Sequence, residues 1–191
     1  NLLFGYKVAE EIKRKLLILW NSFIFFQTYA KGSGFLSKKT FSKRNHILDK
    51  WIVSCLNNLI EKVTKNLNEY NVAAAVEIED FFTENLSLWY VRRSRQRFQK
   101  PRNAQEKEEA VQTFYYVLLN LIKLTAPIMP FLSEEIYQKL KTKKLPESVH
   151  LCDWPRANKK LINSQLEKQM KGIREIAALA LAERAKAGIK V

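Results

Sequence analysis

The sequence contains few of the residues that build metal centres, disulfide frameworks and loop-rich folds. Its 191 residues include only two cysteines, two histidines, five glycines and five prolines. Cys55 and Cys152 lie far apart in the chain, and neither belongs to a CxxC pair, so a reduced compartment is expected and a cysteine-rich zinc site is not. The scarcity of glycine and proline argues against disorder and favours regular secondary structure.

Catalytic signatures are absent as well. The chain has no GxGxxG, no phosphate-binding GxxxxGK[ST] and no GxSxG. The two imidazoles, His46 and His150, belong to no HExxH pattern, and Asp153 beside Cys152 disfavours a thiolate. We therefore expect no catalytic residue, no metal site and no cofactor held by these residues.

Long apolar runs and acidic residues are also in short supply. The most apolar run, Leu16 to Phe26, is too short to cross a bilayer and is interrupted by Asn21 and Ser22. Against 33 lysines and arginines stand 19 acids, which leaves a net charge of +14. Such an excess suits a polyanionic partner, either a nucleic-acid backbone or an anionic membrane surface.

Positive charge is concentrated between Asn85 and Arg102, which reads NLSLWYVRRSRQRFQKPR. The first half of this stretch, Leu86 to Val91, is apolar and aromatic, and we expect most of it to pack in a core. The second half contains no acid. Like charges at helical spacing repel one another, so these arginines require solvent, acidic partners or bound phosphate. The pattern predicts a helix whose apolar first half packs in the core and whose basic second half faces a polyanion.

Hydrophobic periodicity predicts an all-α fold, a bundle of about six helices. The helices are expected at 7–30, 46–69, from Asn71 onward, through the basic stretch to Pro101, at 104–125, in a short segment capped by Ser133, and at 159–187. Asn45 or Asp49 is expected to cap the second helix. The apolar positions Val8 and Ile12 of the first helix and Ile173 and Ile176 of the last are expected to face the core.

Two further segments are expected to be irregular. Residues 31–45 carry a basic, exposed loop, and residues 141–158 include a short extended piece within 149–155.

Several segments carry a family resemblance when they are taken in order. They read KRKLLILWNSFIFFQTYA (13–30), DKWIVSCLNNLI (49–60), ENLSLWYVRRSRQRF (84–98), LLNLIKLTAPIMPFLSEEIY (118–137), SVHLCDWP (148–155) and REIAALALAERAKAGIKV (174–191). Together they resemble the helical anticodon-binding region of class I aminoacyl-tRNA synthetases. The isoleucyl enzyme is the most similar member. Valyl and leucyl enzymes share the WYVR and APxxPFxxEE patterns, but the AGIKV ending favours isoleucyl over valyl.

The resemblance implies a domain organisation. Residues 1–45 would be a linking helix and basic loop that follow a catalytic domain absent from this chain. Residues 46–155 would be the anticodon-binding helical bundle, and residues 156–191 the truncated start of a C-terminal module. The family's HxGH and KMSKS signatures are missing, and LSKKT at 36–40 resembles the second only superficially.

The resemblance also implies a function and partners. The parent enzyme would attach isoleucine to tRNA(Ile) using ATP and magnesium, bound in the absent catalytic domain. This chain would bind tRNA and contact the rest of its own synthetase chain, as a cytoplasmic monomer without a membrane partner.

Candidate site residues follow from charge and from the ability to stack on bases. The expected phosphate contacts are Arg92, Arg93, Arg95, Arg97, Lys100 and Arg102, helped by Lys38, Lys39, Lys43 and Arg44. The candidate base contacts are Trp89, Tyr90, Gln96, Gln99 and Asn103. Three alternatives remain: the equivalent valyl or leucyl domain, a structural docking module without RNA contact, and an anionic-membrane binder. The last is disfavoured because apolar positions are spread around the basic helix.

Overall fold

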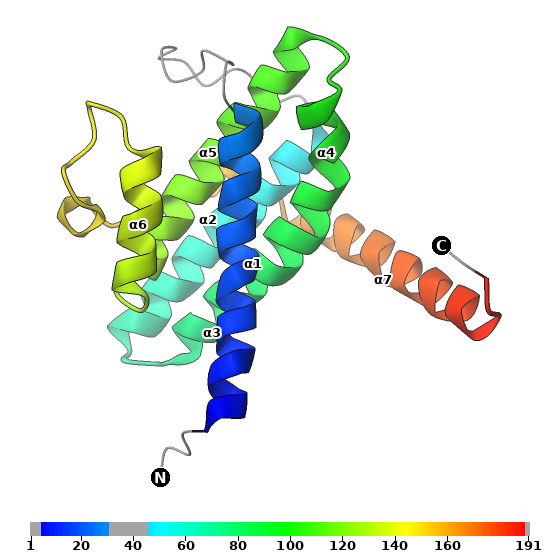
Figure 1. Cartoon of the computed structure of the whole chain (residues 1–191), viewed down its shortest axis with the longest axis horizontal. Coiled ribbons are helices and arrows are strands. Elements are labelled where there is room, and N and C mark those ends of the chain that lie inside the picture. Colours follow the sequence, from blue (N-terminus) through cyan, green and yellow to red (C-terminus); the bar gives the residue numbers. More distant parts are fainter. Residues whose placement is uncertain (1–4, 31–45, 190–191) are drawn as a thin grey trace.

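The computed structural model describes residues 5–30 and 46–189, and these fold entirely as helices, turns and loops without strands (Figure 1). The elements are α1 (Tyr6–Ala30), α2 (Ile47–Asn68), α3 (Ala73–Asp80), η2 (Phe81–Val91), α4 (Arg92–Gln99), α5 (Ala104–Thr125), α6 (Pro130–Leu140), η3 (Val149–Leu151), η4 (Lys159–Leu161) and α7 (Ser164–Lys186). Because α3, η2 and α4 follow one another without a break, the described residues form six helices. The predicted all-α bundle is confirmed. The predicted phosphate contacts Lys38, Lys39, Lys43 and Arg44 lie outside the described residues.

An aromatic cluster around Phe114 of α5 holds the helices together. The rings of Phe26, Tyr90 and Phe98 lie 5.5, 5.9 and 5.8 Å from the Phe114 ring, each in an edge-on arrangement. Such edge-to-face pairs add to the free energy gained by burying apolar area. Since Tyr90 and Phe98 belong to the same continuous helix, the cluster fixes that helix against α1 and α5.

The middle of the continuous helix is a π-helix, η2, in which the backbone is wound more widely than in an α-helix. The Arg92 N–H, for example, donates to the Ser87 carbonyl five residues earlier. Long π segments are rare and are often found at functional sites. The buried positions of η2 are Phe81, Phe82, Leu86, Tyr90 and Val91, so buried side chains recur at steps of four and five residues.

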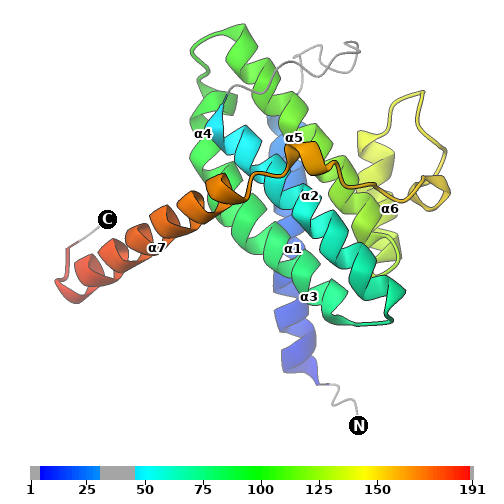
Figure 2. The same ribbon diagram turned by 180° about the vertical axis from the view of Figure 1, so that it is seen from behind.

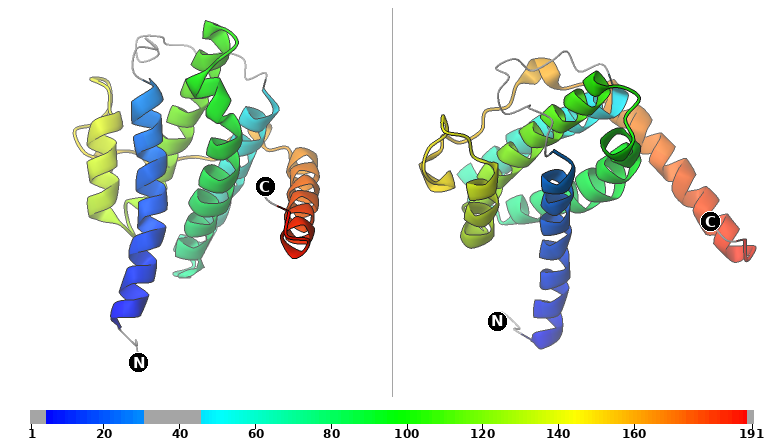
Figure 3. Two further views of the ribbon diagram at one scale, coloured as in Figure 1. Left: turned by 45° about the vertical axis from the view of Figure 1, so that its right-hand side comes forward. Right: turned by 45° about the horizontal axis from the view of Figure 1, so that its top comes forward.

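Both α1 and α7 extend beyond the bundle (Figures 1 and 3). On α1, Leu19 and Phe23 are fully buried, whereas Val8 and Ile12 are half exposed. On α7, the exposed fraction is 54% at Ile173 and 69% at a neighbouring isoleucine, Ile176. The predicted core positions on these two half-helices are wrong, because an amphipathic pattern marks a face but does not supply a neighbouring element to cover it.

The helix starts also differ from the predicted caps. At α2 the cap is His46, whose Nδ1 accepts a hydrogen bond from the Leu48 N–H at 3.2 Å. Asp49 lies in the core instead, and Asn45 is outside the described residues. Ser133 does not cap α6, which begins at Pro130; the Ser133 hydroxyl is buried and bonded to the Thr125 hydroxyl at 2.8 Å.

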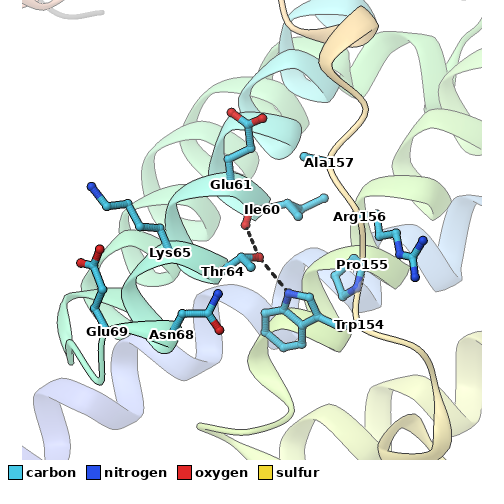
Figure 4. Close-up of a pocket in the computed structure, with 10 residues that line it drawn as sticks. All are labelled: Ile60, Glu61, Thr64, Lys65, Asn68, Glu69, Trp154, Pro155, Arg156 and Ala157. Carbon is cyan, nitrogen blue, oxygen red and sulfur yellow. Dashed lines mark hydrogen bonds between the residues drawn. The ribbon is translucent and has the colours of Figure 1, made fainter.

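After α6 the chain crosses the face of α2 before it enters α7 (Figure 2). Within 149–155, residues 149–151 form the 3₁₀ turn η3, and the backbone at Cys152 directly after it is extended, as predicted, although no strand forms there. Trp154 anchors the crossing: its Nε1 donates to the Thr64 hydroxyl at 2.8 Å, which donates to the Ile60 carbonyl at 2.6 Å (Figure 4). Further along, the Asn158 N–H donates to the Asn57 side-chain oxygen at 2.7 Å.

Candidate nucleic-acid interface

Five exposed cations lie along α4 and in the turn that leads into α5. This cation ridge consists of Arg92, Arg93, Arg95, Lys100 and Arg102. No ion pair joins any of these five side chains to another residue in the described part of the chain. The end of α4 is held against α1, because the Gln99 amide donates a hydrogen bond to the Tyr29 hydroxyl at 2.9 Å. The ridge is thus a set of unneutralised charges on a rigid support.

Arg97 does not belong to the ridge, although the sequence predicted a phosphate contact for it. Its Nη1 and Nη2 donate to the two carboxylate oxygens of Asp49 at 2.8 and 2.7 Å. The two side chains are only 6% and 0% exposed, so Arg97 cannot meet a phosphate at the surface. Although burial alone would lower it, the hydrogen bonds and charge of Asp49 raise the pKa of the Arg97 guanidinium.

Tyr90 is likewise removed from the candidate base contacts. It is fully buried, and its hydroxyl donates to Asp49 Oδ1 at 2.8 Å. Burial and the nearby Asp49 carboxylate hold the pKa of Tyr90 well above its usual range. A buried hydrogen-bonded cluster therefore joins the start of α2 to the helix that carries the ridge; its members are Asp49, Tyr90 and Arg97. Within the described residues, Arg97 Nε and the buried Ser94 hydroxyl have no hydrogen-bond partner.

The remaining candidate base contacts differ in exposure and in whether their side chains already form hydrogen bonds within the protein. Gln96, Gln99 and Asn103 are all exposed. However, the Asn103 side chain caps α5 by accepting from the Glu106 N–H at 2.8 Å, and Gln99 is bonded to α1. Trp89 is half-buried and packs against α7, where its Nε1 donates to the Met170 sulfur at 3.1 Å.

A groove of about 750 Å³ lies between η2–α4 and α7, beside the ridge. Trp89, Arg92 and Arg93 line it from one side, and Lys171 and Arg174 line it from α7. Arg174 lies 5.6 Å from the Trp89 ring centre and donates to the Asn85 side chain at 2.6 Å. Lys171 and Arg174 could not be predicted as site residues, because only the packing of α7 against η2 brings them to the basic stretch.

The start of α7 is fixed by Glu167. Its carboxylate accepts two hydrogen bonds from the Asn58 amide, at 2.7 and 2.8 Å, and one from the Ser54 hydroxyl. The same hydroxyl accepts from the Asn163 N–H at 2.7 Å. These bonds tie the first turns of α7 to α2 and so fix one wall of the groove.

A second cavity, of about 560 Å³, lies between α2 and the crossing segment (Figure 4). Its wall combines opposite charges, with Glu61 and Lys65 on α2, Glu69 directly after α2, and Arg156 on the crossing segment. Figure 4 shows Lys65 and Glu69 pointing away from Trp154. This mixed wall lacks the single sign of charge that a phosphate site requires.

His46 gives the ridge end of the bundle a testable pH dependence. Burial and the charge of Arg97 lower the pKa of His46 below its ordinary value of 6.5. Because the unfolded chain then takes up the proton more readily, the stabilisation is complete above pH 6.5 and is lost as the pH falls through the lowered value. Protonation also removes the Nδ1 acceptor that caps α2.

We expect the melting temperature of the wild-type chain to fall more between pH 7.5 and pH 5.5 than that of His46→Asn. Asparagine retains a capping side chain but does not titrate in this range. Thermal unfolding followed by circular dichroism at both values tests this expectation. Parallel falls in the two proteins would show that His46 does not contribute.

The structure adds two general findings about function. No helix in residues 5–30 or 46–189 is long and apolar enough to cross a membrane. Over the same ranges, no group of three or more histidine, cysteine, aspartate or glutamate side chains is placed to hold a metal ion.

Comparison with known proteins gives a consistent result. The family model of the anticodon-binding domain of tRNA ligase matches residues 49–191. Over 192 aligned residues, the chain is 37% identical to an isoleucine–tRNA ligase of Protochlamydia amoebophila and 40% identical to one of Chlamydia muridarum. An isoleucine–tRNA ligase of Chlamydia trachomatis serovar L2 is also 40% identical. Each alignment covers 100% of this chain but only 18% of the relative.

Proposed function

Because this chain belongs to the family of anticodon-binding domains of tRNA ligases, we propose that its cation ridge binds the phosphate backbone of a tRNA anticodon stem and loop. The observation that carries the proposal is the ridge itself: five exposed cations, without ion pairs to other described residues, along α4 and the turn after it. Phosphate contacts of this kind release counterions and so provide affinity that depends on salt.

The shape of the support favours a positioning role. The ridge residues of α4 are held by the buried Asp49–Arg97 pair beneath them and by the aromatic cluster around Phe114. Because the supporting helix is fixed on two sides, the charges keep a constant spacing. Phosphate contacts with constant spacing set the register of an RNA, while unpaired bases in the loop carry its identity.

We extend the proposal to the parent protein. Since the relatives are isoleucine–tRNA ligases and the chain spans 18% of their length, we propose that the parent attaches isoleucine to tRNA(Ile). The ATP and magnesium that this reaction uses would bind in a catalytic region outside this chain. A cytoplasmic monomer and the division at residues 45 and 155 belong to the same proposal.

A second partner follows from the exposed apolar surfaces. Val8 and Ile12 on α1, with Ile173 and Ile176 on α7, leave two half-helices uncovered. Helices of this kind need an apolar neighbour for stability in water. We propose that other parts of the same parent chain cover them. Docking of this kind uses the two half-helices and leaves the ridge available to RNA.

The proposal predicts preference for one arm of the tRNA. We expect the chain to bind an anticodon stem–loop of tRNA(Ile) on the order of tenfold more tightly than a two-stranded acceptor-stem duplex of equal length, because only the first presents unpaired loop bases. Fluorescence anisotropy at matched salt measures both affinities, and crosslinking locates the contact. Equal affinities, together with crosslinks that avoid α4 and the turn after it, would refute the proposal.

A further inference from the structure

The groove between η2–α4 and α7 contains a stacked arrangement of side chains that the phosphate-binding role does not use. The Arg93 guanidinium carbon lies 4.8 Å from the centre of the Trp89 ring, within the range of a cation–π contact. Arg93 is exposed and Trp89 is half-buried. Trp89 therefore supports one side of a planar cation that solvent can still reach.

The rest of the groove suits a flat, uncharged group better than a phosphate. Apolar contacts are available from Leu88, Ala177, Ala178 and Leu181. Carboxylates line the same groove at Asp80, Glu84 and Glu175. Because Arg92, Arg93, Lys171 and Arg174 line the groove as well, its charge is of mixed sign. A phosphate would therefore gain less there than among the unpaired cations of the ridge, whereas an aromatic ring gains stacking area.

Both walls of the groove are fixed before any ligand arrives. On α7, Arg174 is hydrogen-bonded to Asn85 and lies 3.5 Å from a Glu84 carboxylate oxygen. Glu167 ties the start of the same helix to α2. A groove with fixed walls costs little free energy to organise on binding.

We propose that this groove receives one unpaired base of the RNA loop, which stacks on the guanidinium of Arg93 while Trp89 supports the guanidinium from below. Arginine planes are used for base stacking in RNA recognition, and lysine cannot replace them because its charge is not planar. Arg93 thereby stacks on a base, and the phosphate contacts of the ridge are left to Arg92, Arg95, Lys100 and Arg102. This inference rests on the proposed function.

A double-mutant cycle between protein and RNA tests the inference. The two protein variants are Arg93→Lys and, as a matched control at an exposed position of α1 outside the ridge, Arg14→Lys, both of which keep the net charge. The RNA is the anticodon stem–loop of tRNA(Ile), with each loop nucleotide replaced in turn by an abasic residue. Circular dichroism checks that both variants keep the wild-type helix content.

We expect one abasic position to weaken binding to the wild-type chain by about tenfold, the size of a typical base–side-chain stack. Arg93→Lys should lose a similar factor on the intact loop and no further affinity at that position. Arg14→Lys should bind the intact loop nearly as well as wild type and still show the tenfold loss. The slope of log K against log salt should stay the same in all three proteins.

Two results would overturn the inference, and they differ from each other. If the wild-type chain binds the stem–loop but Arg93→Lys and each abasic change act additively, the base does not stack on Arg93, and the proposed function stands. If the wild-type chain does not bind the stem–loop, both the proposed function and this inference fail.

Discussion

Neutralising four cations of the ridge is expected to weaken binding of the anticodon stem–loop by about 10²–10³-fold at 0.1 M salt. The substitutions are Arg92→Gln, Arg95→Gln, Lys100→Gln and Arg102→Gln. Arg93 is left in place so that the base-stacking position stays intact. Each lost phosphate contact removes roughly one released counterion, so the slope of log K against log salt should become shallower by about 3.

The matched control removes the same number of positive charges elsewhere. Lys7, Lys13, Lys143 and Lys144 are exposed, and they lie on the N-terminal half of α1 and on the segment after α6. Changing these four to glutamine gives the same net charge as the ridge variant but should leave the salt slope nearly unchanged. If the two quadruple variants lose equal affinity, binding follows overall charge and the ridge is not the site.

Replacing Asp49 by asparagine is expected to lower the free energy of unfolding by about 3–5 kcal/mol, because Arg97 then remains as a buried charge without its counter-charge. Asp49 and Arg97 are 0% and 6% exposed, so water cannot compensate. For a chain of this size the melting temperature should fall by about 10 °C. Urea unfolding followed by circular dichroism measures the change directly.

Two further variants establish the cause. Replacing both partners, as Asp49→Leu with Arg97→Met, should recover much of the loss, because no buried charge remains. Recovery should be incomplete, since the Tyr90 hydroxyl loses its acceptor. Lys15→Gln breaks the half-exposed pair with Glu79 and should cost less than about 1 kcal/mol. An Asp49→Asn variant as stable as Lys15→Gln would contradict the structural role of the pair.

The family, the helical fold and the position of the charged stretch could all be predicted from the sequence. Helix periodicity depends on local order along the chain, so the bounds of α1, α2 and α5 agree with prediction to within one residue or so. The matched family domain confirms the resemblance. The contacts with RNA remain predictions.

The roles of individual charged and aromatic residues could not be predicted. Arg97 and Arg95 are indistinguishable by composition, yet one is buried and the other exposed. The difference depends on Asp49, which is distant in sequence and was expected to cap a helix. Similarly, the aromatic neighbours Trp89 and Tyr90 separate into a half-buried ring and a fully buried one.

The basic stretch of residues 92–102 therefore illustrates what each level determines. By itself, the sequence determined that this protein is a helical bundle with a concentrated positive charge, because periodicity and net charge are properties of neighbouring residues. Only the tertiary structure decided which cations face solvent, since that depends on partners brought from α2, α5 and α7. Packing of α7 also created the groove, where Arg174 approaches Trp89 across a long interval of chain.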